Sequence, residues 1–253
     1  MVRSVDRALD VLVLVANEAL PVPLPDITRG LDLPRTTAFS LVKTLAERGM
    51  LTYVDGKGYQ LGPMVSELSR AYRPPRNLIE LAHRWLEQVS AETHETAFLA
   101  VPGDEHIVFV DKVEPMQAIR YSAQIGTRRP LYCTAHGKLA LALRPDAEIA
   151  RYLASTPLKA LTDKTITTVD ALRRELAKIR RQGFATSDGE FSADAFSLSA
   201  PVRAGTDGPL IAMISAVGPT SRLRPRRHQI ADLMLSVATQ LSAQCGGIEP
   251  MSA

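Results

Sequence analysis

The chain has 253 residues, of which 45% are hydrophobic and 23% are charged, and its formal net charge is +3. This length suits two domains, and the composition is that of an ordinary globular protein rather than a disordered or fibrous one. Two cysteines, Cys133 and Cys245, are too few for a disulfide framework or a cysteine-built zinc site, and they fit a reducing cytoplasm. We expect neither a signal peptide nor a membrane span, because charges interrupt the N-terminal segment and no apolar run reaches about 20 residues.

The N-terminal segment predicts two helices joined by a rigid connector. Apolar residues at helical spacing favour a helix over 5–17. The connector 21–25 holds three prolines, and Pro25 can open a short helix that ends at Arg29. The first helix is amphipathic, and its apolar residues share one face: Val5, Leu9, Leu12, Val13 and Ala16.

A third helix and a hairpin follow. Pro34 suits the first turn of a helix over 34–48, and Gly49 ends it. Two short strands, 51–54 and 59–61, flank Asp55-Gly56-Lys57-Gly58, which is a strong hairpin signal. One face of the helix is polar, and the other carries four apolar residues at helical spacing: Ala38, Leu41, Val42 and Leu45.

This order of elements is typical of a winged helix-turn-helix, which places its second helix in the major groove of DNA. The alternative is a small helical subdomain with a hairpin that binds no nucleic acid. Residues 1–62 hold seven Lys or Arg and seven Asp or Glu, so any DNA contact must come from where the cations are placed rather than from bulk charge.

The rest of the chain predicts a linker and an α+β domain. A helix over 64–72 is broken by Arg73-Pro-Pro-Arg76, which gives a DNA-binding domain at 1–62, a linker helix at 63–75 and a second domain at 76–250. We expect Pro201 to place its strand at a sheet edge. Hairpin strands with helices at both ends predict an antiparallel sheet covered by helices. The predicted helices are 78–92, 134–143, 146–153, 169–181 and 229–244, and the strands are 96–101, 106–113, 119–125, 197–202 and 210–217.

Two sets of motifs resemble the IclR family of bacterial transcription regulators. The first set is the run from Arg3 to Leu12, Leu33-Pro-Arg-Thr-Thr-Ala38, 45–51 and Tyr59-Gln-Leu-Gly62. The second is 126–142, which is similar to the hallmark stretch of the family's effector domain, with 183–190, 198–202 and 214–219 further on. Together they cover nearly the whole chain. The resemblance implies a GAF-like effector domain that binds a small molecule, and a homodimer or homotetramer on palindromic operator DNA, without a cofactor.

On this resemblance, the helix over 34–48 reads the major groove. Arg35 and Lys43 are the cations best placed for phosphates or guanine edges. Thr36, Thr37 and Ser40 can reach bases or phosphates, and Phe39 can touch a thymine methyl group. Lys57, at the tip of the wing, would contact the backbone or the minor groove. The family often has a basic residue where Ser40 stands, which favours a distinct operator.

The start of the helix over 134–143 predicts an anion site. The first turn of a helix presents unpaired N–H groups and a positive dipole end, and a small residue such as Ala135 or Gly137 lets a ligand approach. Arg129 could add charge. The alternative is that Thr134 merely caps the helix and Gly137 packs against a strand. By position, the resemblance implies an effector pocket around Tyr121, Arg129, Ala135, His136, Ser197, Ser215 and Val217, with Gly137, Asp194 and Phe196 close by.

Each pocket residue has a structural alternative. Tyr121 and Phe196 could be plain core aromatics, His136 a hydrogen-bonded helix residue, Arg129 a solvent-facing cation and Asp194 the cap of a turn. The mixture of side chains favours a small ligand with an acidic or polar end and a ring, such as an aromatic acid of the hydroxybenzoate kind. Such a regulator would control a catabolic operon, and the sequence leaves repression and activation both open.

An enzyme, such as a hydrolase whose N-terminal unit serves dimerisation, is the second hypothesis. No Gly-x-Ser-x-Gly motif is present to carry a nucleophile, and we expect no catalytic residues. The five histidines are scattered without metal-ligand spacing, so we expect no metal. The basic stretch 222–228 is interpreted as the solvated entry to the last helix.

Overall fold

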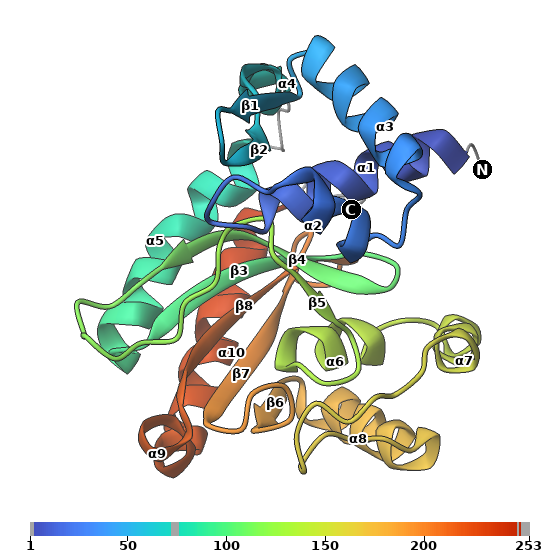
Figure 1. Cartoon of the computed structure of the whole chain (residues 1–253). Coiled ribbons are helices and arrows are strands. Elements are labelled where there is room, and N and C mark those ends of the chain that lie inside the picture. Colours follow the sequence, from blue (N-terminus) through green and yellow to red (C-terminus); the bar gives the residue numbers. More distant parts are fainter. Residues whose placement is uncertain (1–2, 72–75, 247, 249–253) are drawn as a thin grey trace. The chain divides into compact units, whose positions relative to one another are not determined.

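The computed structural model describes residues 3–71, 76–246 and 248. The chain divides into two compact units, Met1–Arg73 and Pro74–Ala253, and Figure 1 shows the elements of both. Residues 73–75 of the predicted boundary, and the predicted end of the linker helix at Tyr72, lie outside the described residues. Among the described residues, no helix combines the length and the apolar character that a bilayer span requires.

The first unit is a winged helix-turn-helix, as predicted. Thr28 and Leu33 join the two helices of the turn through a backbone hydrogen bond of 3.0 Å. The hairpin strands pair antiparallel, with Leu51 opposite Leu61. The elements are α1 (Arg3–Ala16), α2 (Leu24–Gly30), α3 (Arg35–Glu47), β1 (Leu51–Val54), β2 (Gly58–Leu61) and α4 (Pro63–Ala71).

The wing is fastened to the connector before α2. Val22 and Tyr59 exchange two backbone hydrogen bonds of 2.8 Å, so the connector adds one bridge beside the hairpin. Gly58 makes this approach possible. Its φ is +122°, and a Cβ there would lie 2.4 Å from the carbonyl carbon of Val22.

The buried face of α1 differs from the predicted one. Val11 and Val15 are buried in the core of the first unit, together with Ile27, Val42 and Leu51. Three of the residues that the periodicity groups together face solvent instead and form an apolar stripe at i, i+4 and i+8. We call Val5, Leu9 and Val13 the α1 stripe; they are 55%, 54% and 49% exposed. The helix carries two apolar stripes, and periodicity alone could not choose between them.

The second unit is built on one antiparallel sheet with the strand order β5-β4-β3-β8-β7-β6. Its strands are β3 (Thr96–Pro102), β4 (His106–Val113), β5 (Arg128–Pro130), β6 (Ala185–Asp188), β7 (Ala195–Arg203) and β8 (Leu210–Pro219). Its helices are α5 (Arg76–Thr93), α6 (Ala135–Ala142), α7 (Asp146–Ser155), α8 (Val169–Gln182), α9 (Thr220–Leu223), a 3-10 turn (Arg224–Arg226) and α10 (Arg227–Gln244).

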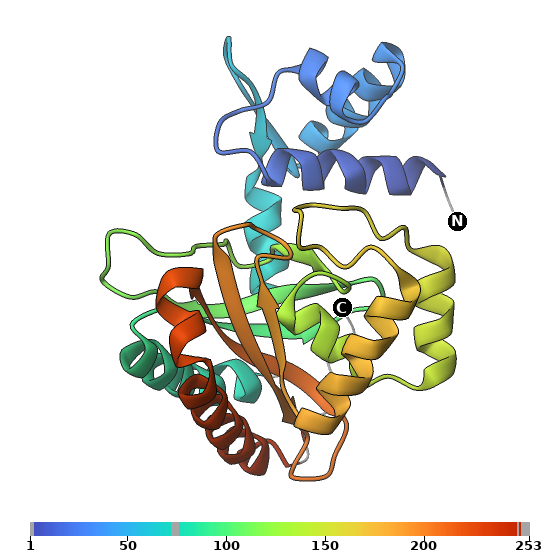
Figure 2. The same ribbon diagram turned by 90° about the horizontal axis from the view of Figure 1, so that it is seen from below.

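Helices cover both faces of this sheet, which confirms the predicted α+β architecture. Figure 2 shows α5 and α10 on one face and α6, α7 and α8 on the other. A separate apolar core fills each side. Leu86 and Met234 belong to the core under α5 and α10, while Leu139 and Leu176 belong to the core under α6 and α8.

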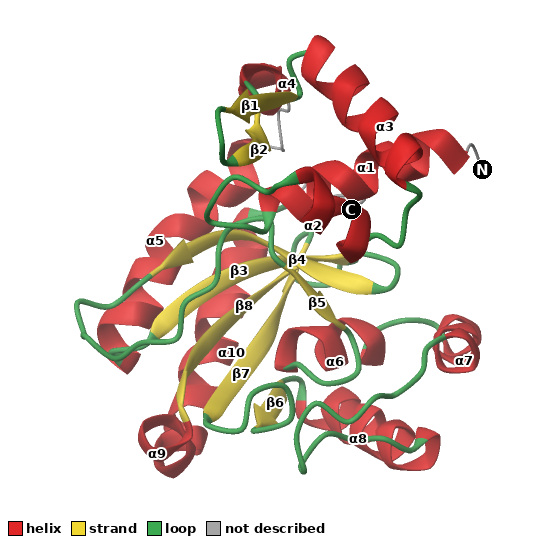
Figure 3. Ribbon diagram, viewed as in Figure 1, coloured by secondary structure: helices red, strands yellow, loops and turns green. Residues whose placement is uncertain are grey.

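The predicted strand over 119–125 is wrong. Residues 114–127 form a loop between β4 and β5 (Figure 3). Ile119 and Ile125 are exposed at its two ends while Ala123 between them is buried, so the segment lacks the continuous buried face of a strand. The partner of β4 is instead β5, where Arg129 lies opposite Ile107. Neither β5 nor β6 was predicted, because each is only three or four residues long and lacks apolar alternation.

The predicted edge position of the strand around Pro201 is also wrong. β7 lies between β8 and β6. Its pairing with β6 ends where Ala185 meets Ser199, while its pairing with β8 runs on past Pro201, which lies opposite Met213. β7 is therefore an edge strand only around Pro201. A proline is tolerated at such a position because its missing N–H removes no hydrogen bond to a neighbouring strand.

Candidate DNA-binding helix and ligand pocket

The polar face of α3 is free for DNA within the first unit. Ala38, Val42 and Leu45 anchor the helix in the core. The residues predicted to contact DNA are all exposed on α3 or, for the last of them, on the turn of the wing: Arg35, Thr36, Thr37, Phe39, Ser40, Lys43 and Lys57. Phe39 is 51% exposed, so its ring is accessible to a DNA base.

The cations of the first unit differ in how they are paired. Arg7, Arg29 and Lys43 lie within 3.4–3.9 Å of carboxylates on their own helices, at Asp10, Asp26 and Glu47. Within the described ranges, Arg35 has no such carboxylate partner. Its charge is therefore the more available of the two cations on α3.

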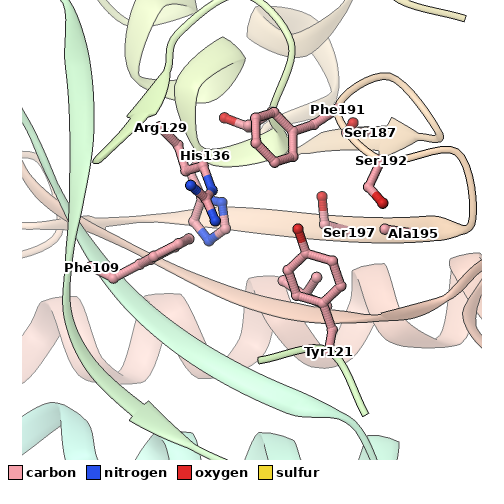
Figure 4. Close-up of a pocket in the computed structure, with 11 residues that line it drawn as sticks. Phe109, Tyr121, Arg129, His136, Ser187, Phe191, Ser192, Ala195 and Ser197 are labelled. Carbon is pink, nitrogen blue, oxygen red and sulfur yellow. The ribbon is translucent and has the colours of Figure 1, made fainter. Parts of the chain in front are cut away.

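The second unit contains a cavity over the sheet face that α6 covers. Its free volume is about 390 Å³, open solvent at its mouth included. Figure 4 shows Arg129 and His136 toward one end, the serines toward the other, and Phe191 and Tyr121 between them. The lining comes from five strands, two loops and the start of α6: Phe109, Tyr121, Arg129, Thr134, His136, Ser187, Phe191, Ser192, Ala195, Ser197 and Val217.

Arg129 supplies the positive charge of the cavity. It lies on β5, and its guanidinium carbon is 4.7 Å from the ring centre of Phe191, a cation–π contact. Its guanidinium donates a long hydrogen bond of 3.4 Å to the carbonyl of Arg128. No ion pair joins Arg129 to a carboxylate among the described residues, so its charge is available to a ligand.

His136 is held as a neutral ring. Its Nε2 is hydrogen-bonded to the hydroxyl of Ser215 on β8, and its ring meets that of Phe109 edge-on at 5.1 Å. Burial and, to a smaller extent, the charge on Arg129 lower the pKa of His136 to about 3. One ring nitrogen therefore donates a hydrogen bond and the other accepts, and the ring adds polarity to the cavity without charge.

The structure brings together five of the ten predicted pocket residues. Tyr121, Arg129, His136, Ser197 and Val217 line the cavity. Ser215 does not line it but orients His136. Ala135 is fully buried, and Asp194 is exposed at the end of a turn, where its carbonyl accepts a hydrogen bond of 2.8 Å from Thr220.

Phe196 and Gly137 lie outside the cavity for physical reasons. Successive residues of a strand face opposite ways, so Phe196 packs in the core under α5 and α10 while Ser197 faces the ligand side. A Cβ on Gly137 would lie 2.4 Å from Cα of Leu131, so this glycine lets α6 pack against backbone rather than a ligand. Thr134 both caps α6, accepting from Gly137 N–H at 3.0 Å, and lines the cavity.

Sequence reasoning missed six lining residues, including Phe109, Thr134 and Ala195. Strand alternation could have found Ala195, since it lies two residues before Ser197 on the same face. The other missed residues, Ser187, Phe191 and Ser192, lie on or just after β6, which has no sequence signal. Within the described ranges, no three His, Cys, Asp or Glu side chains gather where they could bind a metal ion.

Comparison with known proteins decides the family. A model described as "IclR helix-turn-helix domain" matches residues 4–55, and one described as "Bacterial transcriptional regulator IclR C-terminal" matches residues 71–243. The chain belongs to the IclR family of bacterial transcription regulators. This IclR-family protein is a ligand-responsive, DNA-binding regulator and not an enzyme, with DNA bound by the first unit and a small-molecule effector by the second.

Relatives of this IclR-family protein match along most of their length. The HTH-type transcriptional regulator BhcR of Paracoccus denitrificans is 30% identical over 243 residues, which are 95% of this chain and 86% of BhcR. An IclR regulator from Alicyclobacillus acidocaldarius superposes with a TM-score of 0.81 at 26% identity, covering 97% of this chain and 100% of that one. An IclR homologue from Microbacterium hydrocarbonoxydans, solved with 4-hydroxybenzoate, has a TM-score of 0.78 at 26% identity and covers 96% and 98%.

Proposed function

We propose that this regulator controls a catabolic operon in response to a small aromatic monocarboxylate. The observation that carries the proposal is the one unpaired cation that the described residues place at the cavity, Arg129, stacked on the ring of Phe191. In this arrangement a carboxylate can meet the guanidinium while the attached ring lies against aromatic side chains.

The rest of the lining supports the same ligand class. Among the described residues no Asp or Glu lines the cavity, so its lining carries no negative charge, and one cation matches one carboxylate rather than two. Phe109, Phe191 and Val217 supply apolar contact area, and the hydroxyls of Tyr121, Ser192 and Ser197 can bind a ring hydroxyl. The Microbacterium homologue was solved with an acid of this kind.

Replacing Arg129 by methionine is expected to weaken binding of 4-hydroxybenzoate by about 10- to 100-fold, because a charge-assisted hydrogen bond contributes about 1.5–3 kcal/mol. Isothermal titration calorimetry of the full chain measures this. Arg128→Met is the matched control, since Arg128 is the neighbouring, exposed cation on β5 and does not line the cavity. Equal affinity in the Arg129 variant, or binding of benzamide as tight as that of benzoate, would remove Arg129 from ligand recognition.

We also propose that α3 reads a palindromic operator as part of a homodimer. The α1 stripe supplies a surface for self-association, because Val5, Leu9 and Val13 each leave about half of an apolar side chain in water. A two-fold dimer uses the same patch on both copies and matches the symmetry of a palindrome. Assembly to a tetramer would need a further surface. We place the protein in the cytoplasm, where its DNA lies.

Replacing Arg35 by alanine is expected to weaken operator binding by about 1–3 kcal/mol if this residue reads a guanine. The physical reason is that Arg35 is exposed at the start of α3 and has no carboxylate partner among the described residues. A gel shift with the DNA upstream of the regulated operon measures the loss. Arg29→Ala is the control, since Arg29 is exposed on α2 and paired with Asp26. An unchanged operator affinity would exclude Arg35 from the interface.

The effector acts through its different affinity for two arrangements of the dimer. We propose that α4 transmits the change, as the helix between the DNA-binding elements and the second unit, by altering the spacing of the two α3 helices. Half-sites lie at multiples of one DNA turn, so a small change in spacing alters the fit. A reporter strain separates the two modes of control. If the ligand releases the protein from its promoter and expression rises, the protein is a repressor. If the ligand raises expression while the protein stays bound, the protein is an activator.

A further inference from the structure

The outer wall of the ligand cavity is the connection between β6 and β7, residues 189–194. Phe191 and Ser192 of this connection line the cavity, and Phe191 carries the contact with Arg129. The connection is a turn closed by a hydrogen bond of 2.9 Å from Gly189 N–H to the carbonyl of Ala195. A short turn of this kind does not fix its own position relative to α6 and β5, so other contacts must hold it.

A buried ion pair ties this connection to α6. Lys138 is only 1% exposed, and its Nζ lies 2.5 Å from Oε1 of Glu190 and 3.6 Å from Oε1 of Glu175. The other oxygen of Glu190, Oε2, is buried and has no hydrogen-bond partner among the described residues. This ion pair between α6 and the connection therefore uses one oxygen of Glu190 and lies away from solvent, where loss of the Lys138 charge would leave Glu190 without a cation.

A second set of contacts holds Gly189 and Glu190 to the segment before α8. The hydroxyl of Thr162 donates to the carbonyl of Gly189 at 2.6 Å, and that of Thr165 donates to the carbonyl of Glu190 at 2.6 Å. The start of the connection is thus held both to α6, through Glu190, and to the segment before α8, through Gly189 and Glu190. Phe191 follows directly, so the direction of its ring depends on these contacts.

We propose that Lys138 is a positioning residue of the ligand pocket: its buried ion pair with Glu190 fixes residues 189–194 so that Phe191 stacks on Arg129 and Ser192 faces the cavity. Lys138 itself does not line the cavity. It acts through the connection. This inference rests on the proposed function only in treating the cavity as the ligand site.

Hydrogen exchange of the full chain, followed by mass spectrometry, tests the proposal without a ligand. The amides of Gly189 and Ala195 report on the connection, since both are hydrogen-bonded within it, and the amides of β3 report on the sheet. In Lys138→Met we expect exchange at Gly189 and Ala195 to rise at least about tenfold relative to β3. Lys178→Met is the matched control, because Lys178 contacts Glu175 from an exposed position at 3.6 Å, and it should leave the exchange unchanged.

The double variant Lys138→Met with Glu190→Met separates positioning from simple charge balance. It leaves no charge of this pair unpaired, and apolar replacements of a buried ion pair are often neutral for stability. We expect it to unfold like the unsubstituted protein, to exchange Gly189 and Ala195 at least about tenfold faster, and to bind 4-hydroxybenzoate at least about tenfold more weakly. If the amides of Gly189 and Ala195 in the double variant are as protected from exchange as in the unsubstituted chain, the proposal is overturned. It is also overturned if the exchange rate rises equally in β3.

The two proposals fail in different ways. If the unsubstituted chain binds no aromatic acid but the double variant loses protection at Gly189 and Ala195, the ligand class is wrong and the positioning role stands. If the chain binds 4-hydroxybenzoate and the double variant binds it equally well with a protected connection, Lys138 has only a structural role. Should Lys138→Met fail to fold, the double variant and the Lys178 control still decide the question.

Discussion

Replacing Gly137 by alanine is expected to destabilise the second unit by about 3 kcal/mol, the upper end of what overpacking typically costs. The added Cβ would lie 2.4 Å from Cα of Leu131 and 2.5 Å from the carbonyl oxygen of Pro130, both of them backbone atoms. A flexible side chain could move away, but this backbone is fixed by β5 on one side and by the cap of α6 on the other. The gain of about 1 kcal/mol in helix propensity is too small to compensate.

Urea unfolding followed by tryptophan fluorescence measures this effect, because the single tryptophan, Trp85, lies on α5 of the second unit. We also expect weaker ligand binding, since movement of residues 130–131 displaces the neighbouring Arg129. Gly246→Ala is the control, as no atom lies within 4 Å of the Cβ it would carry. If Gly137→Ala unfolds at the same urea concentration as the unsubstituted chain, the close approach of α6 to residues 130–131 does not exist in solution.

The double substitution Leu9→Glu with Val13→Glu is expected to yield a monomer that binds the operator at least about 100-fold more weakly, because the second DNA head no longer binds as a tethered partner. Leu9 and Val13 are 54% and 49% exposed on α1, so the charges should change the stability of the first unit by no more than about 0.5 kcal/mol. Four carboxylates brought together in a two-fold interface would repel one another and lose their water.

Sedimentation velocity gives the oligomeric state, and a gel shift gives the operator affinity. Leu20→Glu is the matched control, since Leu20 is 78% exposed in the same unit but lies after α1 rather than on the stripe. A double variant that still sediments as a dimer would show that the copies meet elsewhere, and retained operator affinity in a monomer would show that a single head suffices for binding.

Local signals predicted the first unit well. In α3, Pro34, Gly49 and the spacing of Ala38, Val42 and Leu45 specify the helix, its ends and its buried face without reference to the rest of the fold. The error on α1 has the opposite cause. Both of its stripes are apolar, and only tertiary packing against α3 and the wing selects Val11 and Val15 for the core.

The sheet and the cavity were harder to predict because they depend on long-range pairing. β5 exists only because Arg128–Pro130 meets residues about 20 positions earlier in β4, and its own sequence carries no strand pattern. The predicted pocket residues lie on or next to the strands and the helix that line the cavity, but some of them point away from it. Ser197 and Phe196 are neighbours, and only the register of β7 against β8 decides which of them faces the cavity.

The two faces of β7 have separate roles, and this affects how ligand specificity can change among such regulators. Ala195 and Ser197 meet the ligand space, whereas Phe196 and Leu198 fill the opposite core. Substitutions at alternate positions of one strand can therefore change which ligand is bound while the intervening positions keep the core intact. A single substitution on the ligand face can therefore change ligand specificity without first destabilising the fold.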